Sequence, residues 1–409
     1  MPENRLDERN VTSRRVTEKT HVVFINSHPI QYFVPLYQQI ACQEAGVLDL
    51  TVLYLSDETT TGYIDTQFGA RIEWDIPLLD GYKHRFVKND SWKPSFYNGF
   101  LGLLNWGLIG ELRRMKKSIV ISHGWAYASN ILSLWVAKAF GHTVCMRGDS
   151  PYCHERYKSK LHRITRLLFL KVFVLSVTDK FLYVGEQNRR LYKSFGIPDH
   201  KLIFVPHAVD NNRFRLAYLT NRDNRDTLRR QMGLEGKKVI LYVGKLIPKK
   251  RPIDLLQAYE QLCQDHDDVV LLYVGDGILR AEIETYCSEH SLTGVHITGF
   301  VNQTDMPCYY AIAEVFVMCS GVGETWGLAV NEAMNFGLPV VVSDLTGCAE
   351  DLVKSGSNGL VFTSGDIGAL VHCLQQILYQ DQIDGRESIA IVERYSYDQL
   401  IDGLSSIPL

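Results

Sequence analysis

Short apolar runs alternate with helical patterns along most of this chain, and the alternation limits the fold more than any other feature. In the first half we expect strands at residues 21–26, 50–55, 119–122, 143–147, 181–184 and 202–205, with the clearest helices at 126–140 and 187–195. Apolar strands that alternate with helices are typical of a parallel sheet covered on both faces. The sequence therefore predicts an α/β fold.

The same pattern restarts in the second half of the chain. Strands are expected at 239–243, 269–274, 296–298 and 315–319, and helices at 253–263 and 279–288. Two such halves predict two Rossmann-like domains across a cleft, with ligands beyond the carboxyl ends of the strands. The predicted order is a flexible tail (1–20), an N-terminal domain (21–209), a polar interdomain segment (210–237), a C-terminal domain (238–385) and a helix (386–409) that returns to the N-terminal domain.

Composition narrows the class of protein. The chain has 409 residues, of which 46% are hydrophobic, which is enough for more than one core. A net charge of −3 gives no sign of a nucleic-acid partner. The nine cysteines include no C-x-x-C pair and favour a reduced compartment. With no secretory signal in the first twenty residues and no apolar run long enough for a membrane span, we expect a cytoplasmic protein.

One loop, helix and strand in succession carries most of the chemistry. Residues 321–344 read GVGETWGLAVNEAMNFGLPVVVSD, with Glu324 in the loop and Glu332 inside the helix. A glycine-rich turn before a helix offers free backbone N–H groups to a phosphate. The two carboxylates can hold two hydroxyl-bearing parts of one phosphorylated ligand. The segment therefore suits a nucleotide-activated sugar.

A basic loop follows the first strand of the second half. Residues 242–252 read YVGKLIPKKRP, so Lys245 and Lys250 are expected above the carboxyl edge of the sheet. Fixed cations near a departing diphosphate stabilise the charge that develops on it. Taken alone, the loop is equally consistent with a solvated basic turn.

Together these segments resemble the family-4 (group 1) retaining glycosyltransferases of the GT-B fold. The resemblance rests on the E-x7-E signature and on a G-R-L-x-x-x-K pattern in which Lys245 replaces the usual Arg. Further similar segments are residues 185–188, 206–211, 275–280 and 299–302. The resemblance implies transfer of a sugar, typically a hexose, from a nucleoside diphosphate to a hydroxyl of a glycan, lipid-linked or small-molecule acceptor in polysaccharide or glycoconjugate biosynthesis. A UDP-sugar is favoured as donor, and GDP-mannose remains open.

The resemblance also implies roles for particular residues. Glu324 would contact and position the transferred sugar as a catalytic residue, and Glu332 would hold the ribose hydroxyls. Lys245 and Lys250 would bind the diphosphate. The other implied donor contacts are Gly244, Phe300, Trp326, Gly327 and Leu328.

The N-terminal half offers candidates on the acceptor side. His123 follows a strand in the motif SHGW, where relatives carry a His near the donor sugar, so we predict a catalytic contact. His28, Gln31 and Tyr32 lie in the first loop after a strand and are candidate acceptor contacts. Relatives often have a glycine pair in that loop, and its absence removes a direct assignment. Arg147 ends another strand and is expected to shape the acceptor side.

No metal or cofactor is expected beside the nucleotide sugar. The DHD segment at 265–267 lies between a helix end and a strand start, on the side of the sheet away from the cleft loops. Two lysines can serve the diphosphate without a divalent ion. Two other functions stay open: an epimerase or hydrolase of nucleotide sugars with the same fold, and an inactive nucleotide-sugar-binding subunit.

Membrane contact is a separate question. Residues 156–171 carry six Lys and Arg and no acid, interleaved with Leu and Ile. A basic amphipathic helix of this kind either lies on an anionic membrane or packs its apolar face on a core. The sequence leaves both arrangements open, the first of which would place the protein peripherally at the inner face of a membrane.

Overall fold

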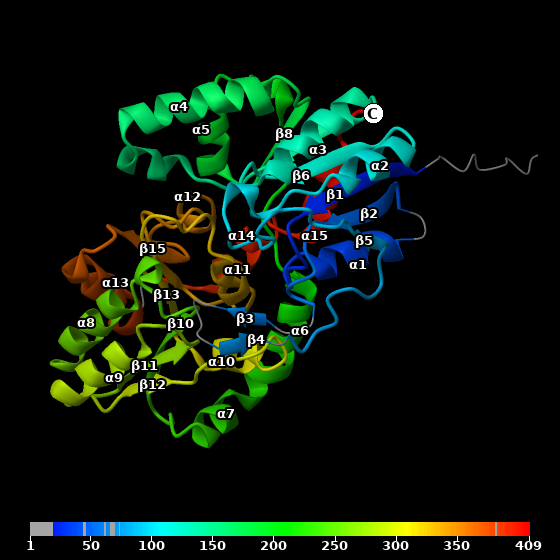
Figure 1. The fold of residues 1–409 in the computed structure, drawn as a ribbon. Helices are drawn as coiled ribbons and strands as arrows, with labels where there is room; N and C mark the ends of the chain where they lie inside the picture. Colours follow the sequence, from blue (N-terminus) through cyan, green and yellow to red (C-terminus); the bar gives the residue numbers. More distant parts are fainter. Residues whose placement is uncertain (1–18, 44–45, 61–62, 66–69, 73, 381–382) are drawn as a thin grey trace, which may run out of the picture.

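The computed structural model describes residues 19–43, 46–60, 63–65, 70–72, 74–380 and 383–409. The expected N-terminal tail therefore falls almost entirely outside the described residues, and Thr20 already begins the first strand. Two parallel sheets, each covered by helices, divide the rest of the chain into two domains (Figure 1). The predicted α/β class is confirmed.

The N-terminal domain is built on a seven-stranded sheet. Its strands are β1 (Thr20–Asn26), β2 (Leu48–Tyr54), β5 (His84–Phe86), β6 (Ile119–His123), β7 (Thr143–Arg147), β8 (Lys180–Tyr183) and β9 (Leu202–Phe204). They are parallel and lie in the order β5-β2-β1-β6-β7-β8-β9, so the strand order reverses between β1 and β6. The helices are α1 (Val34–Cys42), α2 (Gly107–Arg114), α3 (Ala128–Ala139), α4 (Lys160–Leu170) and α5 (Glu186–Ser194), with short turns η1 (Phe100–Gly102), η2 (Tyr152–Tyr157), η3 (Lys171–Leu175) and η4 (Asp199–Lys201). A two-stranded antiparallel ribbon, β3 (Tyr63–Asp65) and β4 (Ala70–Ile72), follows β2 in the chain.

The C-terminal domain is built on a six-stranded parallel sheet. Its strands are β10 (Lys238–Val243), β11 (Val269–Val274), β12 (Val295–Ile297), β13 (Val315–Met318), β14 (Val340–Ser343) and β15 (Gly359–Phe362). The order β12-β11-β10-β13-β14-β15 is that of a Rossmann fold, with the reversal between β10 and β13. The helices are α8 (Pro252–Cys263), α9 (Arg280–Glu289), α10 (Met306–Ile312), α11 (Leu328–Asn335), α12 (Ala349–Leu352), α13 (Ile367–Tyr379) and α14 (Arg386–Val392), with the turn η6 (Pro248–Lys250).

Each strand and helix expected in the two halves is present, with ends shifted by at most two residues, whereas the one helix expected at 386–409 is divided into two separate helices. The central strands are buried because helices cover both faces of each sheet, which explains why their apolar runs are continuous. The pattern missed β5, a three-residue edge strand with two exposed side chains. It also missed β15, whose four residues are only half buried.

The segment expected to connect the domains is instead helical and part of the C-terminal domain. It forms α6 (Asn211–Asn221), η5 (Arg222–Asn224) and α7 (Arg225–Gln231). Phe214 is buried in the core of the C-terminal domain, and Arg225 and Arg229 form ion pairs with Glu314. The charge density of this segment therefore reflects a solvated outer face and specific ion pairs, not an unstructured linker.

The chain ends by crossing back between domains. α14 packs against α11 and α12, whereas the last helix, α15 (Tyr397–Ser405), contacts α1 and β9. Leu400, Ile401 and Leu404 of α15 join the N-terminal core around Val22 and Phe24. The N-terminal domain is therefore completed by the C-terminal end of the chain.

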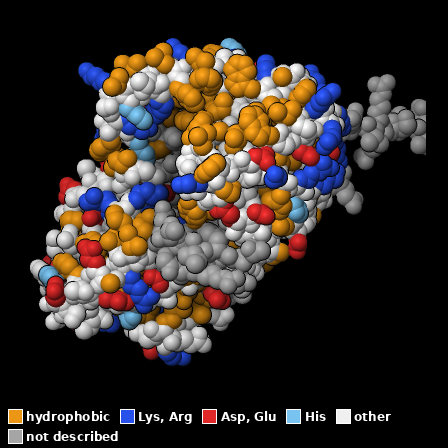
Figure 2. Space-filling model, in the orientation of Figure 1, with side chains coloured by type: hydrophobic (Ala, Val, Ile, Leu, Met, Phe, Trp, Pro, Cys, Tyr) orange, Lys and Arg blue, Asp and Glu red, His pale blue; other side chains and the backbone are white. Residues whose placement is uncertain are grey.

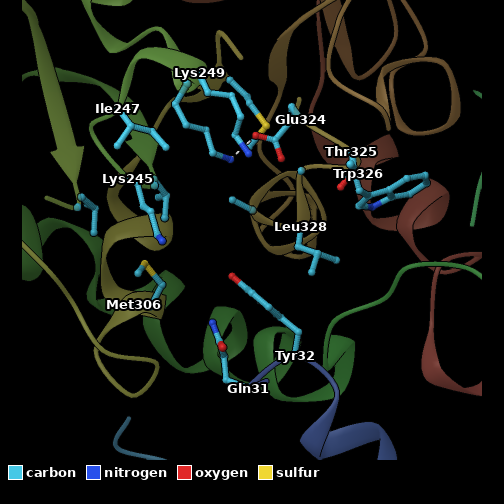
Figure 3. A pocket seen from close by; sticks show the side chains of 18 of the residues that line it. Gln31, Tyr32, Lys245, Ile247, Lys249, Met306, Glu324, Thr325, Trp326 and Leu328 are labelled. Atoms are coloured by element: carbon cyan, nitrogen blue, oxygen red, sulfur yellow. Dashed lines mark ion pairs between the residues drawn. The ribbon is translucent and has the colours of Figure 1, made fainter. Parts of the chain in front are cut away.

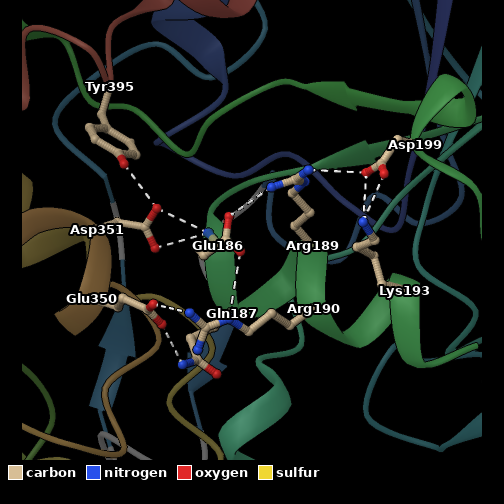
Figure 4. Close-up of polar contacts among 9 residues, drawn as sticks. All are labelled: Glu186, Gln187, Arg189, Arg190, Lys193, Asp199, Glu350, Asp351 and Tyr395. Carbon is tan, nitrogen blue, oxygen red and sulfur yellow. Dashed lines mark hydrogen bonds and ion pairs between the residues drawn. The ribbon is translucent and has the colours of Figure 1, made fainter.

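A polar contact joins the domains at the start of α5 (Figure 4). Both carboxylate oxygens of Asp351 in α12 accept from the backbone N–H of Glu186 at 3.0 Å, and one accepts from the Tyr395 hydroxyl at 2.9 Å. The first free N–H groups of a helix need an acceptor, and here the other domain supplies it. Beside it, Gln187 donates to Glu350 at 2.8 Å. This contact fixes α5 against the C-terminal domain.

Candidate active site

A cavity of about 440 Å³ lies between the carboxyl ends of the two sheets (Figure 3). Both points of strand reversal open onto it: the loop after β1 contributes Gln31 and Tyr32, and the loops after β10 and β13 contribute the basic and acidic side chains. Ten of the residues predicted from sequence line it, namely Gln31, Tyr32, Gly244, Lys245, Lys250, Phe300, Glu324, Trp326, Gly327 and Leu328.

Lys250 and Glu324 form an ion pair at the centre of the C-terminal side of this cavity (Figure 3). The Ser320 hydroxyl donates a further hydrogen bond to Glu324 at 3.1 Å. Burial alone would raise the pKa of the Glu324 carboxyl, but the charge of Lys250 and the hydrogen bond with it hold this pKa below its usual range. Glu324 is therefore a carboxylate at neutral pH. The two residues were expected to serve different parts of the ligand, and the structure places them in direct contact.

Positive charge is concentrated on the same side. Lys245 points into the cavity, and Lys249 lines it as well, with its ammonium donating to the Gly323 carbonyl at 3.3 Å (Figure 3). Burial lowers the pKa of Lys249, and the neighbouring charges of Lys250 and Lys245 lower it further. Three clustered lysines of this kind favour an anionic ligand because a bound anion relieves their mutual repulsion.

The N-terminus of α11 completes this wall of the cavity. Gly327 precedes the helix with φ of 106°, and a Cβ there would lie 2.7 Å from the Met318 sulfur, so a glycine is required. The Trp326 indole N–H donates to Asn331 at 2.9 Å and fixes the approach to the helix. Leu328 and Ala329 of the first turn line the cavity, where free backbone N–H groups are suited to a phosphate.

Glu332 lies one turn further along α11 and is deeply buried. Its Oε2 accepts from the Tyr310 hydroxyl at 2.6 Å, and its Oε1 has no partner among the described residues. Burial raises the pKa of Glu332 to about 7. Glu332 does not line the main cavity. Glu332 lines an adjoining cavity of about 200 Å³, which shares Gln31, Tyr32 and Gln303 with the main cavity.

His123 faces a further adjoining cavity of about 360 Å³ on the N-terminal side. Its Nε2 is buried without a hydrogen-bond partner among the described residues. Burial lowers the pKa of His123 well below its ordinary value, and the charge of Arg147 lowers it further, so the imidazole is neutral. Tyr32 and Leu328 line both this cavity and the main one. His123 therefore adjoins the main cavity without lining it.

Two candidates from the N-terminal half, Arg147 and His28, do not line the main cavity. Arg147 lines the cavity of His123, but it is buried and its guanidinium donates to the Pro206 carbonyl at 2.9 Å, so it mainly holds the chain where it crosses between domains. His28 is absent from the described lining of all three cavities. Its ring stacks on Phe96 with 4.1 Å between ring centroids, and burial lowers its pKa to about 4. Phe96 covers one face of the ring, and the acceptor contact predicted for His28 stays a prediction.

The cavity also contains residues that had not been selected as site residues. Thr325 donates to Asp149 of the N-terminal domain at 2.9 Å, which bridges the two walls. Burial would raise the pKa of Asp149, yet contacts with His207 and Thr325 hold it at about 2. His207 lies in the segment 206–211 that resembles the family, and Asp149 lies two residues after Arg147 at the end of a predicted strand. Trp74, Gln303 and Met306 lie in or next to loops without a periodic pattern, and no sequence signal indicated them.

The DHD segment lies far from this chemistry. Residues 265–267 connect α8 to β11 at the amino-terminal edge of the sheet, and His266 stacks on Tyr379 with 3.6 Å between ring centroids. Among the described residues, no group of three or more His, Cys, Asp or Glu side chains is arranged to hold a metal ion.

Comparison with solved structures identifies the class of fold as GT-B. The Anabaena protein Alr3699/HepE, solved in complex with UDP and glucose, superposes with a TM-score of 0.69 over 95% of this chain and 100% of its own, at 17% sequence identity. At this identity the likeness shows the fold alone. It confirms the expected pair of Rossmann-like domains.

Sequence comparison gives the family. Residues 224–391 match the family described as glycosyl transferases group 1. This part of the chain is therefore similar to the group 1 glycosyltransferases, and the resemblance inferred from the motifs is confirmed.

Two curated relatives show how far the similarity extends. Spore coat protein SA of Bacillus subtilis is 34% identical over 34% of this chain and 38% of its own length. The UDP-Gal:alpha-D-GlcNAc-diphosphoundecaprenol alpha-1,3-galactosyltransferase of Escherichia coli is 25% identical over 65% of this chain and 67% of its own length. The chain thus matches only part of the length of each relative.

The unusual pKa of Glu332 predicts how stability depends on pH. Because the folded-state pKa of about 7 lies above the ordinary 4.5, the folded protein binds the extra proton more tightly than the unfolded chain. This contribution to stability is fully present below the unfolded pKa and is lost as pH rises through 7. Between about pH 5 and pH 8, wild type should lose about 2–3 kcal/mol of unfolding free energy that Glu332→Gln does not lose.

Urea unfolding at each pH measures this difference. Glu289→Gln, at an exposed position on α9, is the matched control and should follow wild type across the pH range. Parallel curves for wild type and Glu332→Gln would show that Glu332 titrates normally and would contradict the assignment.

Proposed function

We propose that this protein is a retaining glycosyltransferase that moves a sugar, most simply a hexose from a UDP-sugar, to a hydroxyl acceptor without a metal ion. The observation that carries the proposal is the convergence of Lys245, Lys249 and Lys250 with Glu324 and the start of α11 on one cavity. Cations and helix N–H groups suit a diphosphate, and a carboxylate suits sugar hydroxyls.

Each part of the donor can be assigned to the cavity residues that suit its chemistry. The diphosphate would contact Lys245, Lys250 and the first turn of α11. The nucleobase would lie towards Phe300, which meets Trp74 of the other domain edge-on with 5.7 Å between ring centroids. The ribose would extend towards Glu332, whose unpartnered Oε1 is a buried acceptor. A hydroxyl that donates to this oxygen would favour the ionised carboxylate and lower its pKa.

The transfer step needs no base from the protein. The acceptor oxygen attacks the anomeric carbon on the face from which the diphosphate leaves, the bond from that carbon to the phosphate oxygen breaks, and the hydroxyl proton passes to the leaving phosphate. Glu324 would position the sugar. The lysines would stabilise the negative charge that develops on the diphosphate. His123, neutral and unpartnered at Nε2, would contact the sugar or the acceptor from the N-terminal side.

The acceptor is proposed only by class. The cavity of His123 opens between the first loop of the N-terminal domain and the loops after β6 and β7, which suits a polyhydroxylated group. A glycan or a lipid-linked sugar, as well as a small molecule, satisfies this chemistry. The curated relative from Escherichia coli acts, by its name, on a diphosphoundecaprenol acceptor, which supports the lipid-linked class.

The lysine assignment predicts a specific kinetic defect. Lys245→Ala and Lys250→Ala should each lower kcat by about 10²- to 10³-fold, because each removes a fixed charge that acts on the leaving diphosphate. Lys354→Ala, an exposed lysine on the same domain, should leave kcat unchanged. Steady-state kinetics with circular dichroism as a check of folding would measure this. Near wild-type turnover in both cavity variants would overturn the diphosphate assignment.

The reaction itself is tested by following anomeric protons by NMR with excess chelator. A panel of nucleotide sugars is first screened for thermal shift, and the best donor is then incubated with a panel of glycan and lipid-linked acceptors. The proposal predicts free nucleoside diphosphate and a product with the anomeric configuration of the donor. An inverted linkage would exclude retention, and complete loss of rate with chelator would exclude the metal-free mechanism.

The same experiment separates the other candidates. An epimerase would change the sugar without an acceptor, and a hydrolase would release free sugar into water. A passive binding subunit would show the thermal shift without turnover of any acceptor. Each of these outcomes would replace the transferase proposal.

A further inference from the structure

The helix α4 turns most of its apolar side chains towards solvent, unlike an ordinary amphipathic surface helix. The side that faces the domain carries Leu170, which is buried, with Leu167 and Arg166 partly buried beside it. Its apolar stripe instead faces solvent: Leu161, Ile164 and Leu168 are exposed by 72%, 56% and 59%. An amphipathic helix normally buries this stripe against the core. In this protein the stripe is not packed on the core, so it is available to contact another surface.

This stripe belongs to a larger apolar surface on the N-terminal domain (Figure 2). The Phe100 ring of η1 meets Phe169 of α4 edge-on with 6.2 Å between ring centroids, and the exposed Trp135 of α3 donates to the Phe173 carbonyl at 3.0 Å. These contacts make η1, α3, α4 and η3 one continuous face. With the segment 91–106, its exposed side chains are Trp92, Tyr97, Phe100, Leu101, Trp106, Trp135, Leu161, Ile164, Leu168, Phe169, Val172 and Phe173. Exposed apolar patches of this extent mark an interaction surface.

The charges around this face decide what it can meet. Lys160, Arg163 and Lys171 are exposed on α4 and η3, and Lys93 is exposed beside Trp92. None of residues 91–110, 128–140 and 156–178 is acidic. The acids that border these ranges are engaged by groups of the same face: Glu155 pairs with Arg166, Asp179 pairs with Lys138, and Glu58 accepts from Ser95. Apolar and aromatic side chains with an excess of basic groups are suited to an anionic lipid surface, where the rings lie at headgroup level and the cations meet phosphate.

We propose that this face, formed by η1, α3, α4, η3 and the segment 91–106, docks the protein onto the surface of an anionic lipid bilayer. Contact is peripheral: among the described residues, no helix combines the length and the apolar character needed to cross a membrane. Docking therefore rests on shallow insertion of the exposed rings and aliphatic chains together with attraction to anionic headgroups.

The docking face borders the candidate active site. Phe96 lies in the same segment as Trp92 and Leu101 and stacks on His28, three residues before Gln31 in the cavity wall. The Tyr127 hydroxyl donates to the Phe96 carbonyl at 2.8 Å and ties this segment to the start of α3. A docked molecule would thus hold its cavity close to groups carried by the lipid surface. This consequence rests on the proposed function, whereas lipid binding itself does not.

Sedimentation with vesicles tests the proposal without reference to activity. The full chain should sediment with vesicles of phosphatidylcholine and phosphatidylglycerol, much less with phosphatidylcholine alone, and progressively less as salt rises. Leu161→Gln, Ile164→Gln and Leu168→Gln combined should weaken binding at least about tenfold. Lys160→Gln, Arg163→Gln and Lys171→Gln should each weaken it about fivefold.

Matched controls make the result specific. Leu216→Gln with Leu219→Gln removes aliphatic side chains that are 67% and 53% exposed on α6, outside the docking face, and should bind vesicles like wild type. Trp92→Ala changes a side chain that is 94% exposed, so it tests the face without opening a core. It should bind more weakly and melt at the wild-type temperature.

Three results would overturn the proposal. Equal binding to charged and uncharged vesicles, or none to either, would remove the anionic lipid as the partner. Wild-type binding by both Trp92→Ala and the triple variant of α4 would remove this face. If the wild-type chain instead forms a dimer by analytical ultracentrifugation and the triple variant is a monomer that binds vesicles no worse, the face is an interface between two copies.

Discussion

Two parallel sheets, each with one point where the strand order reverses, face each other across the main cavity, and the rest of the molecule depends on this arrangement. At such a point the loops after two neighbouring strands diverge and leave a crevice at the carboxyl edge. Here the reversals lie between β1 and β6 and between β10 and β13. The crossing of α15 back onto the N-terminal core and the contact of Asp351 with α5 hold the two edges opposite each other.

Charge gives the cavity its chemistry. Three lysines from one loop line the cavity together with Glu324, and the Lys250–Glu324 ion pair holds that carboxylate ionised although it is buried. A buried pair of this kind contributes little net stability, because desolvation offsets the attraction. In the proposed reaction the pair acts by orientation. An arriving diphosphate would take over the lysine, and Glu324 would then accept hydrogen bonds from the sugar. Asp149 and Thr325 close the cavity at the domain boundary.

Much of the fold could be predicted from the sequence, because a parallel α/β structure produces apolar strand segments that alternate with helical periodicity. The helix carrying Glu332 was expected between the loop and the strand of the segment 321–344, and it spans 328–335. Ten predicted residues line one cavity because each motif directly follows a strand or starts a helix. Loops carry no such periodicity, which is why Trp74 and Gln303 went unrecognised. The helices of 210–237 were missed because a segment dense in charged residues resembles a solvated linker. Its ion pairs with a residue as distant as Glu314 cannot be read from local sequence.

Other features were beyond any local pattern. The partnership of Lys250 with Glu324 joins residues 74 positions apart in the chain and depends on how β10 and β13 lie side by side. Periodicity identifies an amphipathic helix in α4, but only the packing of the domain determines that its apolar stripe faces outwards. The covering of His28 by Phe96 likewise depends on a tertiary contact.

A crystal structure of the protein with UDP, grown in the presence of chelator, tests the central claim most directly. The account predicts the diphosphate within hydrogen-bond distance of the Lys245 and Lys250 ammonium groups and of the first backbone N–H groups of α11, with the ribose beside Glu332. A nucleotide bound elsewhere, or a diphosphate in the cavity that contacts neither lysine, would contradict it.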